Sequence, residues 1–476
     1  MKNNHEVSSV KKMIDNASFE IAGEDQLAEY RRELDGGASD DDPQKIEKKW
    51  GEIISDVQIR LGTLLKTDTV SFLLGAGVSI DCGGVLIGKI PIEIEKDLLK
   101  KGVRDTDNPR VSEWIRYFYL AVKQVNNDDS TVPITRDMII ARKINIQSGD
   151  SQRLNANFEQ VLSTLYKWKS SIAEEGGRIK IEGAVSGYFN YKTIVDCLQE
   201  ASNSLVKLCE LPSKGFEKGI KDYNQFIKKI LTRPLNLKRV NIFTLNYDTL
   251  VEKASDAEGV VLIDGFVGTM KRVFRPECYE QDLYFPAETT EGRVHRHDRV
   301  VHLYKLHGSI TWFSENPDFS NPYGLYSKSS YDSKSDNTVI FPTPLKYGET
   351  LGLPYAELFR RFAASIVRPQ STLFVIGYGF GDDHVNAIIQ QAVTVPSFTL
   401  VIIDPNPQND FIRVIREKKD QRIWIFSGST FGTFSGFINY ALPNLQLENI
   451  ERKVISTYRA LKRDGGDTIN GTKDDE

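Results

Sequence analysis

The sequence is poor in the features that mark secreted or membrane-embedded proteins. Its 476 residues include four cysteines, which are scattered too widely for the disulfide framework of a small secreted protein. No apolar run approaches the roughly 20 residues that span a bilayer. The charged N-terminus also lacks the apolar core of a signal peptide. The sequence therefore predicts a soluble, cytoplasmic protein.

The chain also lacks an excess of charge of either sign. Its 61 Lys and Arg residues are balanced by 65 Asp and Glu residues, for a formal net charge of −4. This balance gives no attraction of the whole protein to nucleic acid or to an anionic membrane, so we expect neither as a direct partner. At roughly 100–200 residues per domain, the length predicts two or three folded units.

Polar stretches lie at both ends of the sequence. Residues 1–45 close with the acidic run DGGASDDDPQK, and we expect them to be largely disordered apart from a possible helix around 24–34. Residues 446–476 are expected to form a helix followed by a polar tail. The folded domain is therefore predicted to occupy residues 46–445.

Short apolar strands alternate with helical patterns between these ends. Several of the strands are apolar throughout, which is typical of strands that helices cover on both faces. The alternation predicts an α/β fold with a Rossmann-like parallel sheet. The predicted strands lie at 69–74, 239–245, 260–264, 300–306, 371–377, 398–404 and 422–426, and predicted helices lie at 355–367, 382–393 and 408–418.

Two long intervals interrupt the alternation. Residues of about 105–235 contain no comparable strands and have helical spacing, which predicts an inserted helical module. Residues 270–338 are irregular apart from the strand at 300–306, and they are rich in aromatic, Ser and Asp residues. Loops of this size often form lids or interfaces. Within this interval, the VHRHD stretch is expected to be a solvated turn, although its His-x-His spacing would also suit a metal.

Glycine-rich loops follow two of the predicted strands. The first strand continues into Gly75-Ala76-Gly77-Val78-Ser79, and the fifth into GYGFGDDH, which includes Gly377 and Gly379. Bare backbone N–H groups beside a helix start attract phosphates, so each loop is a candidate phosphate cradle. The first loop departs from the GxGxxG fingerprint because Ile80 stands where the third glycine would be. Each loop could also be only a tight turn.

Polar side chains follow other strands of the predicted sheet. Asn246 and Asp248 follow the second strand in TLNYD, and His307 follows the fourth in KLHGS. Asp404 ends the sixth strand about 25 residues after Gly377, a spacing at which a carboxylate can take ribose hydroxyls. Asn246 could instead cap the next helix, and a single histidine is often structural. Because carboxyl ends of parallel strands meet at one edge, the whole set favours a nucleotide site.

The motifs GAGVS, TLNYD, LHGS and GYGFGDDH, in this order, resemble those of the sirtuin-like NAD-binding domain. The stretches IDGFVG, LYKLHGSITWF and ELFRRFAASIVRPQSTLFVIGYGFGDDHVNAII resemble more closely the bacterial antiphage-defence proteins that work beside a HerA-type ATPase. The resemblance covers roughly 65–440 and implies NAD as ligand. It implies a pyrophosphate loop at Gly75, Ala76, Gly77 and Ser79, a nicotinamide-ribose pair at Asn246 and Asp248, a catalytic His307, and an adenosine side at Gly377, Gly379 and Asp404.

The chain departs from the sirtuin deacylases at two points. It has no CxxC pair for their structural zinc, and GGVLIGKIPIEIE stands where their Phe–Arg pair follows the first loop. We therefore expect no zinc and predict hydrolysis of NAD⁺ to nicotinamide and ADP-ribose, with Asn246 and His307 as catalytic residues. A deacylase or ADP-ribosyltransferase remains an alternative, as does a module that binds NAD or ADP-ribose without turnover.

No regulatory domain can be identified in the sequence, yet an unrestrained NADase would deplete the NAD⁺ of its own cell. We therefore expect regulation through assembly, as a homo-oligomer and with a HerA-type ATPase ring. The ATPase partner and the role in antiphage defence are implied by the resemblance alone.

Overall fold

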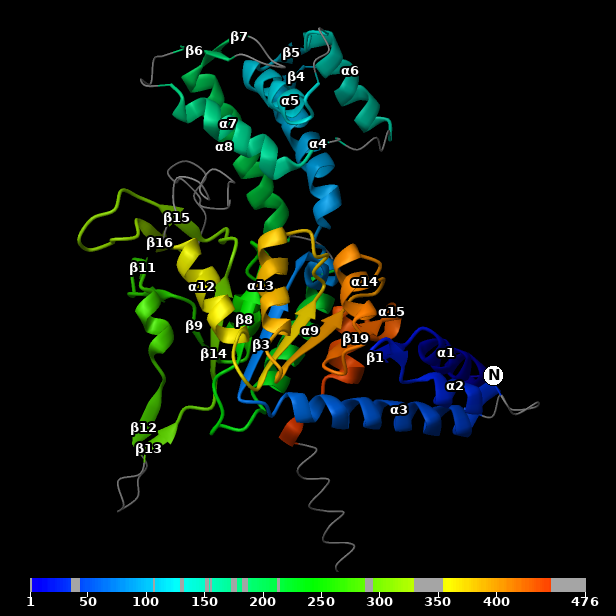
Figure 1. The fold of residues 1–476 in the computed structure, drawn as a ribbon. Helices are drawn as coiled ribbons and strands as arrows, with labels where there is room; N and C mark the ends of the chain where they lie inside the picture. Colours follow the sequence, from blue (N-terminus) through cyan, green and yellow to red (C-terminus); the bar gives the residue numbers. More distant parts are fainter. Residues whose placement is uncertain are drawn as a thin grey trace, which may run out of the picture.

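A nine-stranded sheet forms the centre of the computed structural model (Figure 1). The structure describes residues 2–35, 43–105, 108–128, 132–149, 154, 156–172, 178–181, 187–211, 215–286, 294–328 and 354–446. The strand order is β2-β1-β19-β18-β17-β3-β8-β14-β9, and the strands from β19 to β9 run parallel. Their bounds are β1 Ser18–Ile21, β2 Glu24–Asp25, β3 Thr69–Leu74, β8 Asn241–Thr244, β9 Val261–Ile263, β14 Val300–Lys305, β17 Ser371–Ile376, β18 Phe398–Ile403 and β19 Ile423–Ser427.

The predicted α/β fold and each predicted strand are confirmed. All six residues of β3 and all six of β17 are buried, as expected for central strands covered on both faces. The three predicted helices are found as α12 (Tyr355–Ile366), α13 (Asp383–Val393) and α14 (Asp410–Glu417). Apolar runs therefore predicted the parallel sheet correctly.

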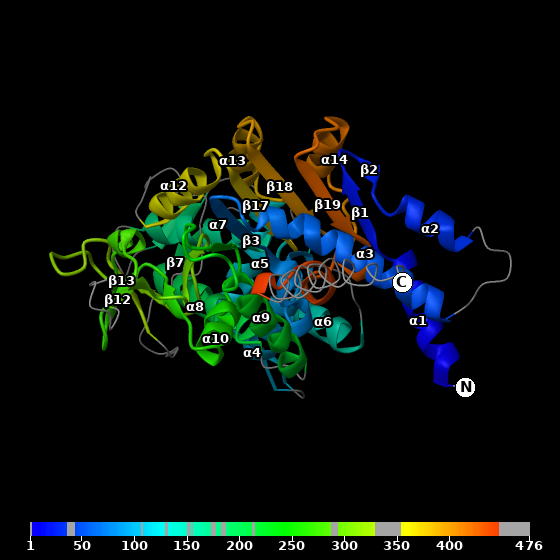
Figure 2. The ribbon, with the colours of Figure 1, turned by 90° about the horizontal axis from the view of Figure 1, so that it is seen from below.

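Helices cover both faces of the sheet (Figures 1 and 2). On one face, Phe72 of β3 packs edge-on against Phe226, in a core shared with α3 (Pro43–Leu64), α9 (Phe216–Ile230) and α10 (Leu250–Ala257). On the other face, Phe243 of β8 packs against Phe362, in a core shared with α12, α13 and α14. The buried strands thus separate two apolar layers.

The order of the strands reverses direction beside β3. The chain proceeds from β3 to β8 and beyond on one side, and from β17 to β18 and β19 on the other. Such a switch point leaves a crevice at the carboxyl ends of the two central strands, which is where α/β sheets bind ligands. The loops after β3 and β17 both open into this crevice.

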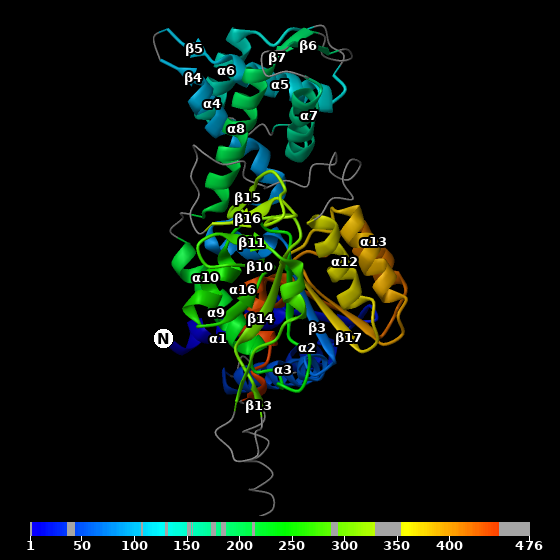
Figure 3. The ribbon, with the colours of Figure 1, turned by 90° about the vertical axis from the view of Figure 1, so that its left-hand side faces the viewer.

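A helical module lies over the carboxyl ends of the strands (Figures 1 and 3). It comprises α4 (Ile90–Gly102), α5 (Glu113–Val125), α6 (Arg136–Gln147), α7 (Phe158–Ser170) and α8 (Tyr191–Cys209), with the short pairs β4 (Val103–Arg104)–β5 (Arg110–Val111) and β6 (Arg178–Ile181)–β7 (Gly187–Asn190). These helices share a separate apolar core that includes Phe118 and Leu162.

The module differs from the predicted 105–235 at both ends. It begins earlier, because α4 packs against α5, α6 and α8. It ends earlier, because Tyr223, Phe226 and Ile227 bury the apolar face of α9 in a core of the sheet. Helical periodicity predicted the helices but could not say which core each of them joins.

The interval 270–338 is more regular than its composition predicts. Its described part contains β11 (Arg272–Phe274), β15 (Trp312–Ser314) and β16 (Leu325–Ser327), which form a four-stranded antiparallel sheet with β10 (Phe266–Val267). The strands β12 (Tyr284–Pro286) and β13 (Val294–Arg296) form a hairpin, so His295 lies in a strand and not in the predicted turn. The parts at 287–293 and 329–338 lie outside the described residues.

The N-terminal residues also differ from the expectation of disorder. The segment contains α1 (Lys2–Asp15), β1 and β2, and β1 pairs antiparallel with β19. It also contains α2 (Ala28–Asp35), which agrees with the helix expected around 24–34. Phe19 is fully buried and stacks on Phe426 with 4.4 Å between ring centroids. The polar composition of the segment obscured the short alternating strand SFEI. The predicted helix and tail at 446–476 lie outside the described residues from 447 onward.

Among the helices of the described residues, none combines the length and apolar character that crossing a membrane requires.

We predict that Phe19→Ala destabilises the whole domain, because it removes a ring packed against a strand of the main sheet. Deletion of a buried aromatic side chain typically costs about 3–5 kcal/mol of unfolding free energy. Thermal and urea unfolding measure the effect, with Val414→Ala on the exposed face of α14 as the control. Equal stability of the two variants would mean that β1 contributes nothing to the core.

Candidate functional site

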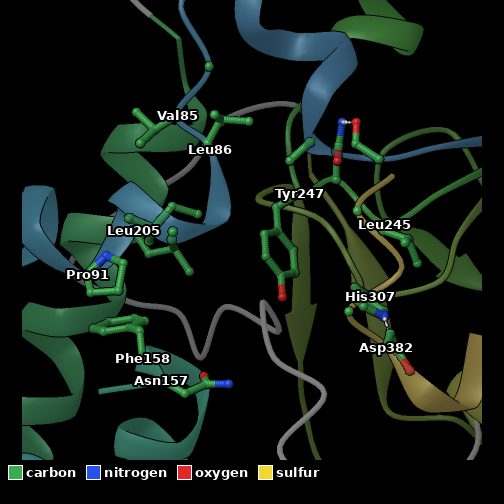
Figure 4. A pocket seen from close by; sticks show the side chains of 18 of the residues that line it. Val85, Leu86, Pro91, Asn157, Phe158, Leu205, Leu245, Tyr247, His307 and Asp382 are labelled. Carbon is green, nitrogen blue, oxygen red and sulfur yellow. Dashed lines mark hydrogen bonds and ion pairs between the residues drawn. The ribbon is translucent and has the colours of Figure 1, made fainter. Parts of the chain in front are cut away.

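A cavity of about 1100 Å³ lies between the strand ends and the helical module. Loops after β3, β8, β14 and β17 form its floor, and residues of α4, α7 and α8 form its roof. Figure 4 shows Tyr247, His307 and Asp382 on one side of the space and Pro91, Phe158 and Leu205 on the other. The predicted crevice at the switch point is thus a covered cavity.

The structure brings nearly all of the predicted site residues together here. The cavity is lined by Gly75, Ala76, Gly77, Ser79, Asn246, Asp248, His307, Gly377 and Gly379. Asp404 is the exception, because it lies at the end of β18 outside this lining. Its Oδ1 accepts a hydrogen bond of 2.8 Å from the backbone N–H of Asn406, which closes a turn. Burial raises the pKa of Asp404, and this hydrogen bond only partly offsets the effect.

The two glycine loops pack directly on each other. The Gly77 N–H donates to the Gly377 carbonyl at 2.8 Å, where η1 (Ala76–Cys82) begins. A Cβ on Gly77 would lie 2.7 Å from the Gly377 Cα, and a Cβ on Gly75 would lie 2.5 Å from the Gly377 oxygen. Gly377 itself has a left-handed φ of +63°. The fold therefore excludes side chains at these positions whether or not a phosphate is bound.

Two further glycines of the second loop have a different surrounding. Among the described residues, no atom lies within 4 Å of a Cβ added at Gly379 or Gly381. Both residues line the cavity. Space therefore remains beside the Cα atoms of Gly379 and Gly381, whereas the loop-to-loop contact fills it at Gly77 and Gly377.

Asn246 connects the turn after β8 to the first glycine loop. Its Nδ2 donates to the Gly75 carbonyl at 2.9 Å and to the Ser79 Oγ at 3.1 Å. The turn that leads into α10 is made instead by Asp248, whose Oδ1 accepts from the Leu250 N–H at 3.1 Å. The alternative of Asn246 as a helix cap is therefore wrong. Both amide protons are thus used within the protein, and among the described residues no hydrogen bond is made to its Oδ1, which can accept one from a ligand.

Asp248 is held from two sides beneath the cavity. Its Oδ2 accepts a hydrogen bond of 2.7 Å from the Ser79 hydroxyl, so Asp248 acts on Asn246 through Ser79. The side chain of Lys305 is 3% exposed and donates to the backbone carbonyl of Asp248 and, at 2.9 Å, to Glu252 Oε1. These contacts join the end of β14 to the turn after β8. They therefore tie the segment that carries His307 to the segment that carries Asn246.

His307 contacts a carboxylate that the sequence analysis did not assign to the site. Its Nε2 lies 3.2 Å from Asp382 Oδ2, and the other oxygen of Asp382 caps α13 by accepting from the backbone of His384 at 2.9 Å. Burial alone would raise the pKa of Asp382, but the His307 side chain and the capping N–H groups lower it overall. An Asp directly before a helical pattern is a cap signal. The contact with His307 has no signal in the sequence.

The charged side chains of the cavity are acidic. Asp248, Asp382 and Asp383 line it, and the lining formed by the described residues includes no Lys or Arg. Carboxylates favour positive charge that develops nearby. Cys209 also lines the cavity, but burial raises the pKa of its thiol to about 12. A protonated thiol is a poor nucleophile, so Cys209 is not suited to covalent catalysis.

The apolar roof was not predicted. It is formed largely by Leu86, Ile90, Pro91, Val125, Leu154, Phe158, Leu205 and Leu208. In the sequence, such residues at helical spacing are indistinguishable from residues of the module's own core. Only the position of the module over the sheet identifies them as cavity residues.

We predict that Gly77→Ala and Gly379→Ala, the same change in two cavity loops, differ in stability. Forcing a methyl group against the Gly377 backbone should cost about 1–3 kcal/mol. The Gly379 variant has free space for the methyl group and should stay within about 0.5 kcal/mol of the unchanged protein. Thermal unfolding without ligand measures both. A stable Gly77→Ala protein would contradict the close packing of the loops.

Comparison with known proteins relates part of the chain to a known domain. Residues 240–424 match the family model of the SIR2-like domain. No curated protein matches the chain. Similar solved structures include a mutant Sir2 homologue with ADP-ribose (13% identity, TM-score 0.28, covering 76% of this chain and 94% of that one). A Sir2 homologue with NAD is also similar (11% identity, TM-score 0.28, covering 76% of this chain and 94% of that one). So is a mutant Sir2 homologue with 2′-O-acetyl ADP-ribose (12% identity, TM-score 0.29, covering 76% of this chain and 97% of that one). The residues 240–424 that match this family model include Asn246, His307 and the second glycine loop.

Proposed function

We propose that this protein hydrolyses NAD⁺ to nicotinamide and ADP-ribose. The observation that carries the proposal is the convergence of Asn246 and His307 on one cavity at the switch point of the sheet. The match of residues 240–424 to the SIR2-like domain supports a nicotinamide dinucleotide as the ligand.

The cavity suits a dinucleotide in size and in its available backbone. Pockets for small ligands commonly enclose about 300–1,000 Å³, and this one encloses about 1100 Å³. With no Lys or Arg in the described lining, a pyrophosphate would depend on backbone N–H groups. The space beside Gly379 and Gly381 fits that requirement, because no atom of the described residues lies within 4 Å of where a Cβ would stand at either residue.

The proposed reaction breaks the bond between nicotinamide and ribose. The transition state has oxocarbenium character, and nicotinamide leaves as a neutral group with the bonding electron pair. Water supplies the new C1–O bond and releases one proton, which His307 accepts as the general base. The Asn246 Oδ1 orients the water or a ribose hydroxyl, and Asp248 and Asp382 favour the positive charge of the ring. These roles require no covalent bond to the protein.

Two other functions share the same ligand. An NAD-dependent deacylase or ADP-ribosyltransferase would need an acyl-lysine or another acceptor, whereas a sensing module would bind NAD without consuming it. Product chromatography separates them, because hydrolysis alone yields nicotinamide and ADP-ribose in equal amounts without any peptide. Turnover that depends on an acyl-lysine peptide would favour the deacylase.

We predict that Asn246→Ala and His307→Ala each abolish most of the NAD⁺ hydrolysis. Loss of a general base typically costs about 10²–10⁴-fold in rate. The Asn246 variant also loses hydrogen bonds to Gly75 and Ser79, so its thermal unfolding must be measured beside nicotinamide release. His295→Ala, in the hairpin β12–β13, is the control and should keep the unchanged rate. Near-normal hydrolysis by a folded His307→Ala protein would remove His307 from the mechanism.

From the resemblance described above, we further propose regulation by assembly and a role in antiphage defence through NAD⁺ depletion. We predict a homo-oligomer that also binds a HerA-type ATPase ring. Light scattering of the protein alone and mixed with such an ATPase measures both, with nicotinamide release followed in the same mixtures. A monomer that ignores the ATPase at micromolar concentrations would contradict this prediction.

A further inference from the structure

We propose that Asp382 is a positioning residue that fixes the tautomer of His307, so that Nδ1 is the atom that accepts the proton. The role of this proton in catalysis rests on the proposed function. The tautomer itself does not depend on it.

The position of the Asp382 carboxylate is fixed from several directions. Its Oδ1 accepts from the backbone N–H groups of His384 and Val385, at 2.9 and 3.3 Å, in the first turn of α13. Its backbone N–H donates to the Tyr378 hydroxyl at 3.0 Å, and this hydroxyl also lies 3.1 Å from the Asp382 carbonyl. With one carboxylate oxygen and the backbone held, Oδ2 is presented to the His307 Nε2 at 3.2 Å.

The protonation of the pair follows from this geometry. An ionised carboxylate has no proton to donate and can only accept a hydrogen bond. Because the pKa of Asp382 is lowered, it is ionised at neutral pH, and Nε2 of His307 must carry the hydrogen. In a neutral imidazole the other nitrogen is then the acceptor. In the part of the chain that the structure describes, no hydrogen bond occupies Nδ1, and His307 lines the cavity.

Carboxylates and aromatic rings surround His307 in the cavity. Asp382 contacts it directly, and Asp248 lies in the same cavity lining, on the turn after β8. Tyr247 of that turn lies 6.5 Å from it between ring centroids, and Phe359 of α12 lies 6.3 Å from it. The ring of His384 packs against Phe359, at 4.7 Å.

Two further charged groups lie near this pair along the chain. Asp383 follows Asp382 and lines the cavity, while Lys305, on the strand that leads to His307, is bound to Glu252 and the Asp248 carbonyl. The lysine charge is thus paired, and the carboxylate of Asp382 is the charge in hydrogen-bonding distance of the imidazole. Loss of that carboxylate removes the acceptor that holds the imidazole hydrogen on Nε2.

The substitution Asp382→Asn can change the tautomer of His307 while it keeps the helix cap. A carboxamide has a single oxygen, and the N–H groups of α13 require an acceptor. If the oxygen keeps the cap, the amide NH₂ faces His307 Nε2 and forces the imidazole hydrogen onto Nδ1. In a Ser-His-Asp triad, the equivalent change lowers kcat by about 10⁴-fold through the wrong tautomer.

Nitrogen NMR of the histidine rings, in the full chain without substrate at pH 8, tests the tautomer directly. We expect Nε2–H on His307 in the unchanged protein and Nδ1–H in Asp382→Asn, with little change in melting temperature. Asp383→Asn is the matched control, since it removes an adjacent carboxylate from the same cavity. It should leave the His307 tautomer unchanged. An Nδ1–H tautomer in the unchanged protein, or the same tautomer in all three proteins, overturns the proposal.

Kinetics then test the consequence for hydrolysis. We expect Asp382→Asn to lower kcat by about 10²–10⁴-fold with KM within a few-fold. Normal kcat in a variant with the altered tautomer would overturn Nδ1 as the base. The expected tautomers in a protein that does not hydrolyse NAD⁺ would uphold the positioning role and refute the proposed function.

Discussion

The contact between the two glycine loops is the constraint on which the rest of the site depends. It joins the ends of β3 and β17, the two strands at which the strand order reverses. The two loops lie so close together that no side chain fits at the contact. Asn246 is anchored to the same place, because its amide donates to the Gly75 carbonyl. The backbone of β3 thus sets the position of a candidate catalytic amide two residues beyond the neighbouring strand β8.

The remaining polar groups extend this arrangement outward by hydrogen bonds. Ser79 of the first loop donates a hydrogen bond to the Asp248 carboxylate. Lys305 donates to the Asp248 carbonyl and so connects Asp248 to the end of β14. His307 follows two residues later and meets Asp382 from the second loop. Four separate chain segments therefore hold one another in place around the cavity through these hydrogen bonds.

Much of this arrangement could be predicted from the sequence, and the missing part has a physical reason. Apolar runs predicted the strands, and the carboxyl-end rule predicted that Asn246 and His307 would meet, since parallel strands end at one edge. The pairing of His307 with Asp382 could not be predicted, because the two residues lie 75 positions apart and their contact depends on side-chain direction. The roof residue Phe158 was missed for a similar reason, since helical periodicity shows that a residue is apolar but not which surface it faces.

The strand β1 has a consequence for the sheet beyond the burial of Phe19. By pairing with β19, it covers a row of backbone N–H and C=O groups that would otherwise be exposed along the edge of a long parallel sheet. The outermost strand on this side of the sheet, β2, pairs with β1 and has only two residues, so the edge strand of the sheet is short. Short edge strands offer little template for pairing with another chain. The first residues of the protein therefore protect it against edge-to-edge aggregation, a task that their polar composition alone would not suggest.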